Sequence, residues 1–410
     1  MTLRIGVLGT GFVAHFHLHA LQAVRNVQVA GIYGHSEARR EAAVRLADEL
    51  GLGPCRGYES IEHLVADEDS IDAVWILRTN FDRLADMRAI VQTNRSRGRP
   101  LLGVACEKPL ARTLKEAREM LRLADEAGLN HGYLENQVFA PAIQRGKDII
   151  WRRAVPATGR PYLARSAEEH SGPHRRWFWQ GTEQGGGVLL DMMCHSVEAA
   201  RFLLTEPGKD RTTLRVKSAN GTVATLKWSR PEYVERLKQE MDSQLDYSRR
   251  PAEDYARGVV MLEDEQGRPV VIEATTSWAY VGPGLRLQME LLGPEYSLEI
   301  STLNTPLKVF LSRNVHGASG EDLVEKQNSE QGLMPVVDDE AASYGYTAED
   351  RHMVEAFRTG QRPSETFADG VAVIEILMAL YRSAELGRTL SLPDPELEEY
   401  VPPPARLGSG

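Results

Sequence analysis

An aspartate and a histidine stand four residues apart in the stretch at 185–195, which reads G-G-G-V-L-L-D-M-M-C-H. On a helix this spacing places Asp191 and His195 on one face. Histidine is the usual general acid/base near neutral pH, and a nearby carboxylate can orient the imidazole or a substrate. The glycines would let the backbone pass close to a bulky planar ligand. The pattern indicates an acid/base site, although the spacing alone favours a surface aspartate and a packed histidine.

A second pattern near the start of the chain points to phosphate binding. Gly9, Gly11 and Ala14 form a G-x-G-x-x-A turn between an apolar run and a helical pattern. The first glycine permits the tight turn, the second lets the backbone approach a pyrophosphate, and the alanine lets the helix pack closely. The helix N-terminus offers N–H groups to an anion. We expect these three residues, with Phe12 and Val13, to bind a dinucleotide; the alternative is an ordinary glycine-rich turn.

The end of the next strand bears on the choice of dinucleotide. A carboxylate there would bind the ribose 2′-hydroxyl of NAD, but the segment 33–36, Y-G-H-S, contains none. Ser36, Arg39 and Arg40 can instead hold the 2′-phosphate of NADP. The alternative is that both arginines lie on a solvated helix face. The sequence therefore leaves NAD or NADP open, with a slight preference for NADP.

Lys108 follows the apolar run 101–105 in the tripeptide Glu107-Lys108-Pro109. Ligands of open parallel sheets bind at the carboxyl ends of the strands, so a lysine at this point can face a nicotinamide and a substrate hydroxyl. Pro109 biases the lysine away from helical geometry. The alternative is a surface lysine in a loop, and the tripeptide by itself does not favour a catalytic lysine over that alternative.

These residues need elements to position them, and the first 130 residues alternate between two kinds of segment. Apolar runs of strand length alternate with helical patterns of ten or more residues, which predicts βαβ units and a parallel sheet. The expected strands are 3–8, 27–33, 71–77 and 101–105, and the expected helices are 12–24, 37–50, 83–93 and 114–127.

The rhythm changes after residue 130, and the rest of the chain predicts an α+β domain with a largely antiparallel sheet. The run at 285–292 alternates with period two, as a strand with one exposed face does. We take the polar segments 230–256 and 312–346 as loops. The expected domains are 1–130 and 131–395, followed by a disordered tail at 396–410. The expected helices are 141–151, 188–204, 347–358 and 371–386, and the expected strands are 223–228, 258–262, 270–278 and 285–292.

The composition excludes several classes of protein. A net charge of -10 over 410 residues argues against a nucleic-acid binder. Three cysteines without a C-x-x-C pair argue against a secreted disulfide framework. No apolar run approaches the roughly 18 residues of a membrane span, and the N-terminus does not have the form of a signal peptide. We expect a cytoplasmic protein without membrane or nucleic-acid partners.

Two further segments can line a substrate site. The stretch 170–179 mixes basic and aromatic side chains, and Trp177 or Trp179 can stack on a sugar face while His174 binds a hydroxyl. Packing of these rings between loop and sheet describes the stretch about as well, and single-stranded nucleic acid fits poorly with the acidic charge. Asn136 follows the expected domain junction and can line a cleft.

Three histidines near the glycine turn, at positions 15, 17 and 19, look like a metal cluster. Two-residue steps on a helix point to nearly opposite faces, so only His15 and His19 could share a metal. We expect these side chains to pack beside the turn, and we predict no metal site.

Together these segments resemble the Gfo/Idh/MocA oxidoreductase family, and the resemblance spans most of the chain in order and spacing. It implies an α/β fold: an N-terminal Rossmann domain with a doubly wound parallel sheet, then a domain with a large open, mostly antiparallel sheet that forms homo-oligomers, dimers or tetramers. The matching residues are Gly9, Gly11 and Ala14; Glu107-Lys108-Pro109-Leu110-Ala111; Gly185-Gly186-Gly187 with Asp191 and His195; Thr359-Gly360-Gln361-Arg362-Pro363; Tyr381-Arg382-Ser383-Ala384-Glu385; and Gly387-Arg388.

The resemblance also implies an activity and roles for residues. The activity is hydride transfer between NAD or NADP and a secondary alcohol of a sugar, a sugar derivative or a cyclic polyol. Lys108 would stabilise the substrate oxygen and contact the nicotinamide. His195 would be the acid/base, and Asp191 would bind a neighbouring hydroxyl or tune the site. All three would contact the substrate.

One segment departs from the family pattern. The family often has A-T-P-N-x-x-H where this chain has L-R-T-N-F-D-R at 77–83. Only the asparagine is kept, and Arg83 replaces the usual histidine. Arg78 would lie near the nicotinamide, or would bind a carboxylate or phosphate on the substrate. The cofactor contacts expected in this half of the site are Arg78, Asn80, Glu107 and Lys108.

Two other functions fit the same fold. A glycosidase could keep NAD bound and use transient oxidation to ease elimination. A ligand-sensing protein could bind a sugar without turnover, although the presence of Lys108, Asp191 and His195 argues against it.

Overall fold

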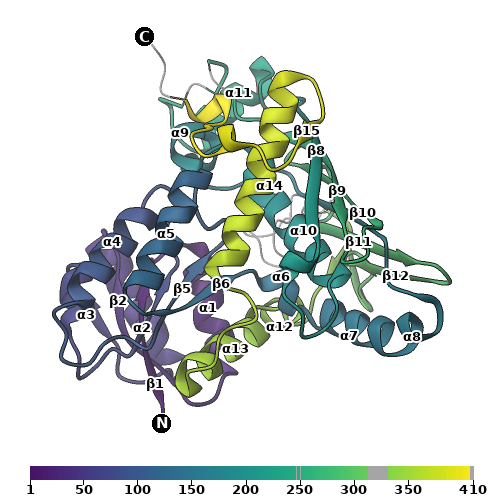
Figure 1. Cartoon of the computed structure of the whole chain (residues 1–410). Coiled ribbons are helices and arrows are strands. Elements are labelled where there is room, and N and C mark those ends of the chain that lie inside the picture. The colour runs from purple at the N-terminus through teal and green to yellow at the C-terminus, as the bar shows by residue number, and fades with distance from the viewer. Residues whose placement is uncertain (246, 250, 313–330, 407–410) are drawn as a thin grey trace. The chain divides into compact units, whose positions relative to one another are not determined.

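The computed structural model of the chain describes residues 1–245, 247–249, 251–312 and 331–406. The chain forms two compact units (Figure 1). The first unit joins Met1–Pro141 to Ala341–Ala372, and the second joins Ala142–Glu340 to Val373–Gly410. A domain boundary at residue 130 stays a prediction. The two units are not continuous in sequence, however, because the late segment Ala341–Ala372 packs with the first unit and not with residues 131–395.

The first unit contains a six-stranded parallel sheet with the order β3-β2-β1-β4-β5-β6. This order confirms the predicted doubly wound sheet, whose winding reverses between β1 and β4. Ligands of such sheets bind at the carboxyl ends of the strands near that reversal. The strands are β1 (Leu3–Leu8), β2 (Val27–Tyr33), β3 (Arg56–Tyr58), β4 (Ala73–Ile76), β5 (Gly103–Glu107) and β6 (Asn130–Leu134).

Three helices of this unit begin where a polar side chain caps them. Ser36, Ser60 and Thr113 each accept the N–H group three residues ahead, which satisfies one free donor of each helix start. Helix α13 packs over Gly103 and Gly132, where a Cβ would collide with its side chains. The helices are α1 (Phe12–Gln22), α2 (Glu37–Glu49), α3 (Ile61–Ala66), α4 (Arg83–Asn94), α5 (Leu114–Glu126), α6 (Asn136–Phe139), α12 (Glu340–Ser343) and α13 (Tyr346–Thr359).

The second unit contains a seven-stranded sheet with the order β12-β11-β7-β10-β9-β8-β15. Among the described strands of this sheet, only the β7–β10 pair is parallel, which confirms the mostly antiparallel sheet. A separate hairpin joins β13 (Leu307–Leu311) to β14 (Gly332–Val336). The sheet strands are β7 (Leu163–Glu169), β8 (Arg215–Ala224), β9 (Tyr255–Glu263), β10 (Pro269–Ser277), β11 (Arg286–Gly293), β12 (Tyr296–Ser301) and β15 (Leu390–Ser391).

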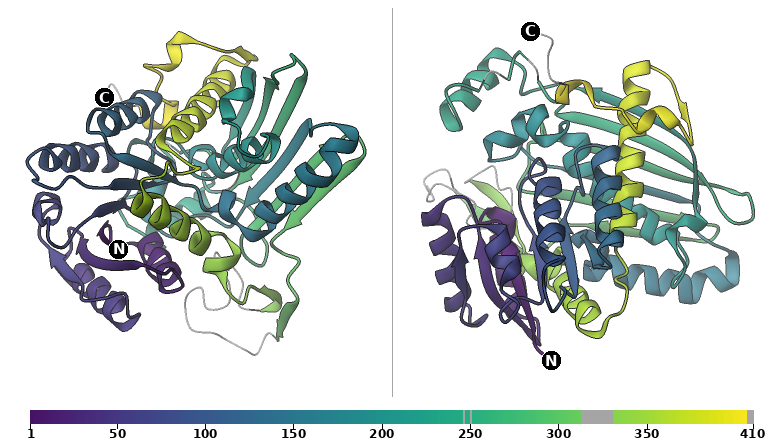
Figure 2. Two further views of the ribbon diagram at one scale, coloured as in Figure 1. Left: turned by 60° about the horizontal axis from the view of Figure 1, so that its bottom comes forward. Right: turned by 60° about the vertical axis from the view of Figure 1, so that its left-hand side comes forward.

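Two helices cover one face of this sheet, α10 (Val188–Leu204) and α14 (Phe367–Leu386) (Figure 2). Burial alternates along β9, β10 and β11, so every second side chain faces these helices, as the period-two pattern predicts. Gly258 of β9 lies against Leu380 of α14 and Met193 of α10, and a side chain there would displace both. A glycine at position 258 therefore leaves room for the two helices to pack against β9.

Short helices complete the second unit. The helix expected at 141–151 continues past its regular part through one π-helical turn. The elements are α7 (Pro141–Ile149), the π-helix η1 (Ile150–Ala154), α8 (Val155–Thr158), α9 (Gly181–Gln184), α11 (Pro231–Glu240) and the 3-10 turns η2 (Arg176–Trp179), η3 (Arg211–Thr213), η4 (Pro395–Leu397) and η5 (Pro403–Ala405).

Three expectations for the second unit need correction. The strand expected at 223–228 ends at Ala224, because the Asp254 carboxylate accepts the next N–H groups, those of residues 226–228, in a turn. The segment 230–256 is not all loop: α11 begins with Pro231 and buries Val234 and Leu237. The segment 312–346 contains β14 and α12, and its residues 313–330 lie outside the described part.

The tail also differs from the expected disorder. Residues 396–406 pack back on α14, where the Tyr400 hydroxyl donates to Glu385 at 2.9 Å and Arg406 pairs with the same carboxylate at 2.7 Å. Residues 407–410 lie outside the described part. In the described chain, no helix is both long enough and apolar enough to cross a membrane.

Candidate active site

The glycine turn has the form that phosphate binding requires. Gly9 has φ +129°, and a Cβ there would lie 2.5 Å from the Leu77 carbonyl oxygen. A Cβ on Gly11, by contrast, would meet no neighbouring atom within 4 Å, so the backbone there is open to an incoming group. Ala14 is buried beneath the turn. Because Gly11 has no side chain to cap α1, the first turn of this helix can donate to an anion.

The end of β2 contains cations and a hydroxyl but no carboxylate. The Ser36 hydroxyl accepts the N–H group of Arg39 at 3.4 Å and so begins α2. The Arg40 guanidinium donates to the Gly34 carbonyl at 3.1 Å, which fixes the loop after the strand. Ser36 and Arg40 thus shape the loop, whereas Arg39 is exposed on the first turn of α2.

Arg78 lies at the end of β4 and is turned toward the end of β2. Its guanidinium pairs with Asp82 at 3.0 Å and with Asp86, contacts His35, and lies 5.5 Å from the centre of the Tyr33 ring. Asp82 thus lies beside this charge, and burial raises the pKa of Asp86 to about 7 against the lowering effect of Arg78. Contact of Arg78 with a cofactor, or with a carboxylate or phosphate on the substrate, stays a prediction.

Arg83 binds the backbone on both sides of Lys108. This buried side chain donates to the carbonyl of Glu107 at 2.7 Å and to the carbonyl of Pro109, and its Nε donates to the Arg78 carbonyl at 3.0 Å. Lys108 itself is partly exposed directly after β5. Arg83 thus ties the loop of the predicted catalytic lysine to the loop of Arg78. The sequence pattern marked Arg83 only as a departure from the family.

The Glu107 side chain is buried inside the first unit. Its carboxylate contacts His17 Nε2 at 3.0 Å, and the Nδ1 atom of the same ring contacts Asp350 at 2.9 Å. Trp75 also donates to Asp350, at 3.0 Å. Glu107 is only 2 % exposed, and its carboxylate joins β5 to α1 and, through His17, to α13. The expected contact of Glu107 with the cofactor stays a prediction.

His17 also stands beside a further carboxyl group. Ligand atoms of His17, Glu107 and Glu349 lie within 4.8 Å of one another, all of them buried. Burial lowers the pKa of His17, but the carboxylates of Asp350 and Glu107 outweigh it and raise that pKa well above the usual value. Burial and the neighbouring negative charges raise the pKa of Glu349. The surroundings thus favour the charged form of His17 and the protonated form of Glu349.

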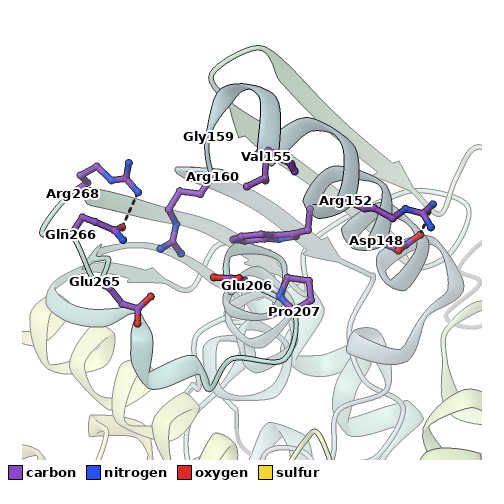
Figure 3. Close-up of a pocket in the computed structure, with 12 residues that line it drawn as sticks. Asp148, Arg152, Val155, Gly159, Arg160, Glu206, Pro207, Glu265, Gln266 and Arg268 are labelled. Carbon is purple, nitrogen blue, oxygen red and sulfur yellow. Dashed lines mark hydrogen bonds and ion pairs between the residues drawn. The ribbon is translucent and has the colours of Figure 1, made fainter.

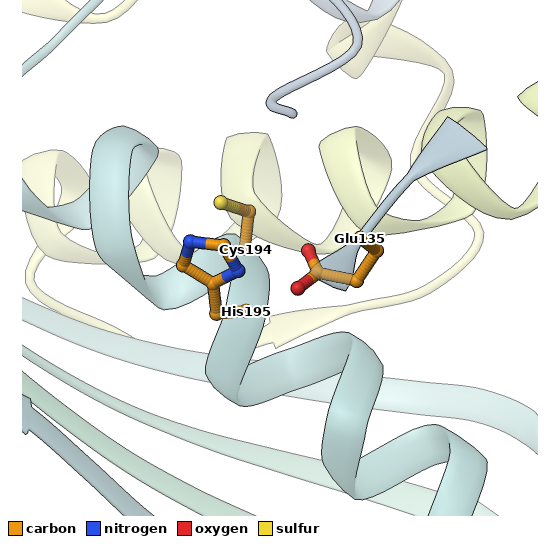
Figure 4. Close-up of side chains that lie close together, drawn as sticks. All are labelled: Glu135, Cys194 and His195. Atoms are coloured by element: carbon orange, nitrogen blue, oxygen red, sulfur yellow. The ribbon is translucent and has the colours of Figure 1, made fainter. Parts of the chain in front are cut away.

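The predicted acid/base pair lies on α10 in the second unit. Asp191 is 6 % exposed and His195 is 5 % exposed. Cys194 precedes His195 on the same helix (Figure 4) and donates its thiol to the Asp191 carbonyl at 3.2 Å, as a buried filler would. Lys108 lies in the first unit. That Lys108, Asp191 and His195 bind one substrate together stays a prediction.

Three side chains bind the last carbonyls of α10. Lys147 donates to Phe202 at 2.7 Å, Trp151 to Leu203 at 2.9 Å and Arg160 to Leu204 at 2.8 Å. Cations and N–H donors at this end match the negative pole of the helix dipole. The segment 147–160 therefore binds the carboxyl end of the helix that carries Asp191 and His195.

The other expected substrate residues have mixed outcomes. Trp179 is 2 % exposed and packs against Trp228, Tyr247 and Trp278, so its expected stacking on a sugar is wrong and the packing alternative holds. Trp177 stacks on Phe178, with 3.8 Å between the ring centres.

The remaining two expected substrate residues differ in burial. His174 is exposed. Asn136 is buried and donates to the Tyr344 carbonyl at 2.8 Å. Asn80, expected at the cofactor, is buried as well.

A separate cavity of about 570 Å³ lies in the second unit, beside the carboxyl end of α10 (Figure 3). Arg160 and Glu206 are among its lining residues, together with Trp151. Arg160 pairs with Asp264 at 3.5 Å and lies over the Trp151 ring. None of the predicted catalytic residues lines this cavity.

Comparison with known proteins matches both units. Residues 3–133 match the model of the oxidoreductase family with an NAD-binding Rossmann fold, named GFO_IDH_MocA, and residues 156–299 match the GFO/IDH/MocA C-terminal domain. The 1,5-anhydro-D-fructose reductase of Ensifer adhaerens is 34 % identical over 206 residues, which cover 50 % of this chain and 57 % of that protein. The chain thus spans little more than half the length of this relative.

Two other similarities extend over the whole chain. The D-apiose dehydrogenase of Rhizobium rhizogenes is 23 % identical over 407 residues, which cover 95 % of this chain and 97 % of that one. The crystal structure of GenD2 from gentamicin A biosynthesis, in complex with NAD, is 25 % identical with a TM-score of 0.74 and covers 96 % of this chain and 97 % of that one. With both family models matched in order, the chain belongs to the Gfo/Idh/MocA oxidoreductase family.

Proposed function

We propose that the chain is an NAD(P)-dependent oxidoreductase that acts on a secondary alcohol of a sugar, a sugar derivative or a cyclic polyol. The observation that carries the proposal is the buried pair Asp191 and His195 on one face of α10, in a chain whose first unit has the open glycine turn of a dinucleotide site. The named activities of the relatives, a reductase of anhydrofructose and a dehydrogenase of apiose, support a sugar-like substrate.

The residues divide the chemistry of alcohol oxidation among them. His195 takes the proton of the substrate hydroxyl at a ring nitrogen. The Lys108 ammonium group stabilises the negative charge that develops on the same oxygen, and Arg83 holds the backbone on either side of that lysine. Asp191 orients the substrate or the imidazole. The nicotinamide, when bound, supplies the hydride acceptor or donor.

We propose NADP as the preferred cofactor. Support comes from the end of β2, where the loop after Tyr33 has no carboxylate for a ribose 2′-hydroxyl and where Arg39 is exposed on the first turn of α2. Ser36 and Arg40 shape the same loop.

The homo-oligomer through the second-unit sheet stays a prediction, which light scattering of the purified protein tests.

A matrix of NAD and NADP against sugars, inositols and sugar acids, read by the absorbance of the reduced nicotinamide, tests the activity. In the active combination, His195→Ala should lower kcat by about 10² to 10⁴-fold. His63→Ala removes an exposed histidine of α3 and is the control. Wild-type turnover in His195→Ala would refute the assignment, and glycoside cleavage without net cofactor reduction would replace it with a glycosidase.

A further inference from the structure

The first turn of α10 begins with glycines, yet every N–H group that a helix leaves free at its start has an acceptor. An α-helix starts with four such groups, and a glycine N-cap has no side chain to bind them. Here only two residues, both distant in sequence, accept all four. The Tyr381 hydroxyl accepts Gly187 N (3.0 Å) and Leu190 N (3.3 Å), the Glu253 carbonyl accepts Val188 N (3.0 Å), and Glu253 Oε1 accepts Leu189 N (3.0 Å).

The glycine run makes this close approach possible. A Cβ on Gly186 would collide with the Tyr381 hydroxyl, and a Cβ on Gly187 would collide with the backbone of Glu253. These two glycines are therefore required by neighbours within the unit. This contact replaces the expectation that the glycines make room for a planar ligand.

The two accepting residues also bind each other inside the unit. The Tyr381 hydroxyl on α14 donates to Glu253 Oε1, just before β9. Tyr381 is 2 % exposed and Glu253 is 4 % exposed. One hydroxyl and one carboxyl group thus connect α14, the segment before β9 and the start of α10. A displacement of α14 or of the segment before β9 would therefore change the hydrogen bonds of the first turn of α10.

The donors around Glu253 favour its charged form. Leu189 N–H and the Tyr381 hydroxyl both point at Oε1, and the positive end of the helix dipole adds to them. The other titratable groups nearby are Tyr247, whose pKa the Glu253 charge helps to raise, Asp254, whose carboxylate is bound by backbone N–H groups, and Asp191 in the first turn of α10. Among the described residues, the main groups that shift the pKa of Glu253 include no cation.

We propose that Glu253 and Tyr381 are positioning residues for the acid/base pair: they hold the first turn of α10, and with it Asp191 and His195. The catalytic part of this inference rests on the proposed function, whereas the capping part does not. Burial raises the pKa of Glu253 to about 7, against the hydrogen bonds that lower it. The cap therefore loses its charge as the solution becomes acidic.

Amide hydrogen exchange of the peptide that contains residues 188–191 tests the cap without any substrate. Tyr381→Phe removes the acceptor of two N–H groups and should speed exchange in this turn by about tenfold. Tyr400→Phe is the matched control, because it removes a partly buried Tyr–Glu hydrogen bond of the same unit that does not touch α10. Wild-type exchange at 188–191 in Tyr381→Phe would overturn the proposal.

Kinetics test the positioning role with the pair Glu253→Gln and Tyr381→Phe. Both should lower kcat by roughly 10 to 100-fold while the dissociation constant of NADPH stays unchanged, because small displacements of an acid/base group slow the chemical step. Glu253→Gln should also lose the acidic limb near pH 7 that Tyr400→Phe retains. Unchanged kcat and pH profile, with only a lower melting temperature, would show a merely structural role and overturn the proposal.

The two proposals fail in distinguishable ways. If no polyol or sugar is turned over by the wild type, the exchange experiment still decides whether Glu253 and Tyr381 cap α10. If the wild type is active and His195→Ala is not, wild-type rates in both cap variants would overturn the positioning role alone.

Discussion

The two units hold their predicted catalytic residues by different means. In the first unit, Lys108 follows a strand whose end is fixed by fully charged groups: Arg83 binds the flanking carbonyls, and Glu107 is paired with His17 at 3.0 Å. In the second unit, Asp191 and His195 lie on a helix whose start is held by Glu253 and Tyr381.

The difference lies in which group titrates near neutral pH. The hydrogen bond and the charge of His17 outweigh burial and lower the pKa of Glu107, and the carboxylates raise the pKa of His17, so this pair stays charged across the neutral range. Burial raises the pKa of Glu253 to about 7, and Glu253 has no comparable cation beside it among the described residues. Near neutral pH the scaffold should therefore respond through Glu253 in the second unit and through Asp86 in the first, because burial raises the pKa of Asp86 to about 7 as well.

Removing the imidazole of the first unit is expected to have the largest effect. His17→Leu leaves Glu107 and Asp350 buried without their partner, and this should lower the free energy of unfolding by about 3–5 kcal/mol. Urea unfolding at neutral pH measures it. His19→Leu, on an exposed position of the same helix, is the control and should change the value by less than about 0.5 kcal/mol. Equal stabilities of the two variants would show that the pairs contribute nothing.

The second unit should lose stability as the pH rises. The folded pKa of Glu253 is raised from 4.5 to about 7, so its contribution is fully present below about pH 4.5 and is lost as the pH passes 7. The stability of the wild type relative to Glu253→Gln should fall by about 3 kcal/mol over this range. Parallel unfolding curves at several pH values give the difference, and a flat difference would show that folding leaves the pKa of Glu253 unchanged.

A methyl group at Gly186 should disturb the cap by a smaller amount. Gly186→Ala places its Cβ against the Tyr381 hydroxyl, and overpacking of this kind costs about 1–3 kcal/mol. In a Tyr381→Phe background the hydroxyl is absent, so the added cost of Gly186→Ala should shrink. The double-mutant cycle measures this coupling. Strict additivity would show that the two groups do not meet.

The smallest expected effect concerns the cofactor. Arg39→Ala should raise KM for NADP about tenfold and leave KM for NAD unchanged, because only NADP has a 2′-phosphate for the guanidinium. Arg45→Ala, on the same helix and also exposed, is the control. An equal change for both cofactors would exclude a role in choosing between them.

The sequence predicts the bounds of a helix or strand well where a continuous apolar pattern marks the whole element. The strands Leu3–Leu8 and Val27–Tyr33 and the helix Val188–Leu204 have the bounds that their apolar patterns indicate. Strand β3 has only three residues, too few to show a period. Helix α11 did have a signal, since Pro231 stands at its first turn with apolar residues three apart behind it.

The candidate site divides in the same way. Gly9, Lys108 and the pair on α10 stand in local patterns, so their types and spacing suffice to find them. The residues that cap α10 do not stand in a local pattern: Tyr381 is 194 residues from Gly187, and Glu253 is 64 residues from Leu189. Only the fold brings such groups together, and no periodicity in either segment indicates it.

The path of the chain between its two units limits how this protein can be divided. Helix α13 belongs to the first unit but follows six of the seven strands of the second-unit sheet, all except β15, and it supplies Asp350, the partner of His17 and Trp75. A gene fragment that ends at residue 141 would encode all six parallel strands, yet it would lack the Asp350 carboxylate. Recombination at a single point therefore cannot transfer the dinucleotide unit intact to another protein, and exchange of the second unit requires two junctions that preserve both α13 and the register of α14.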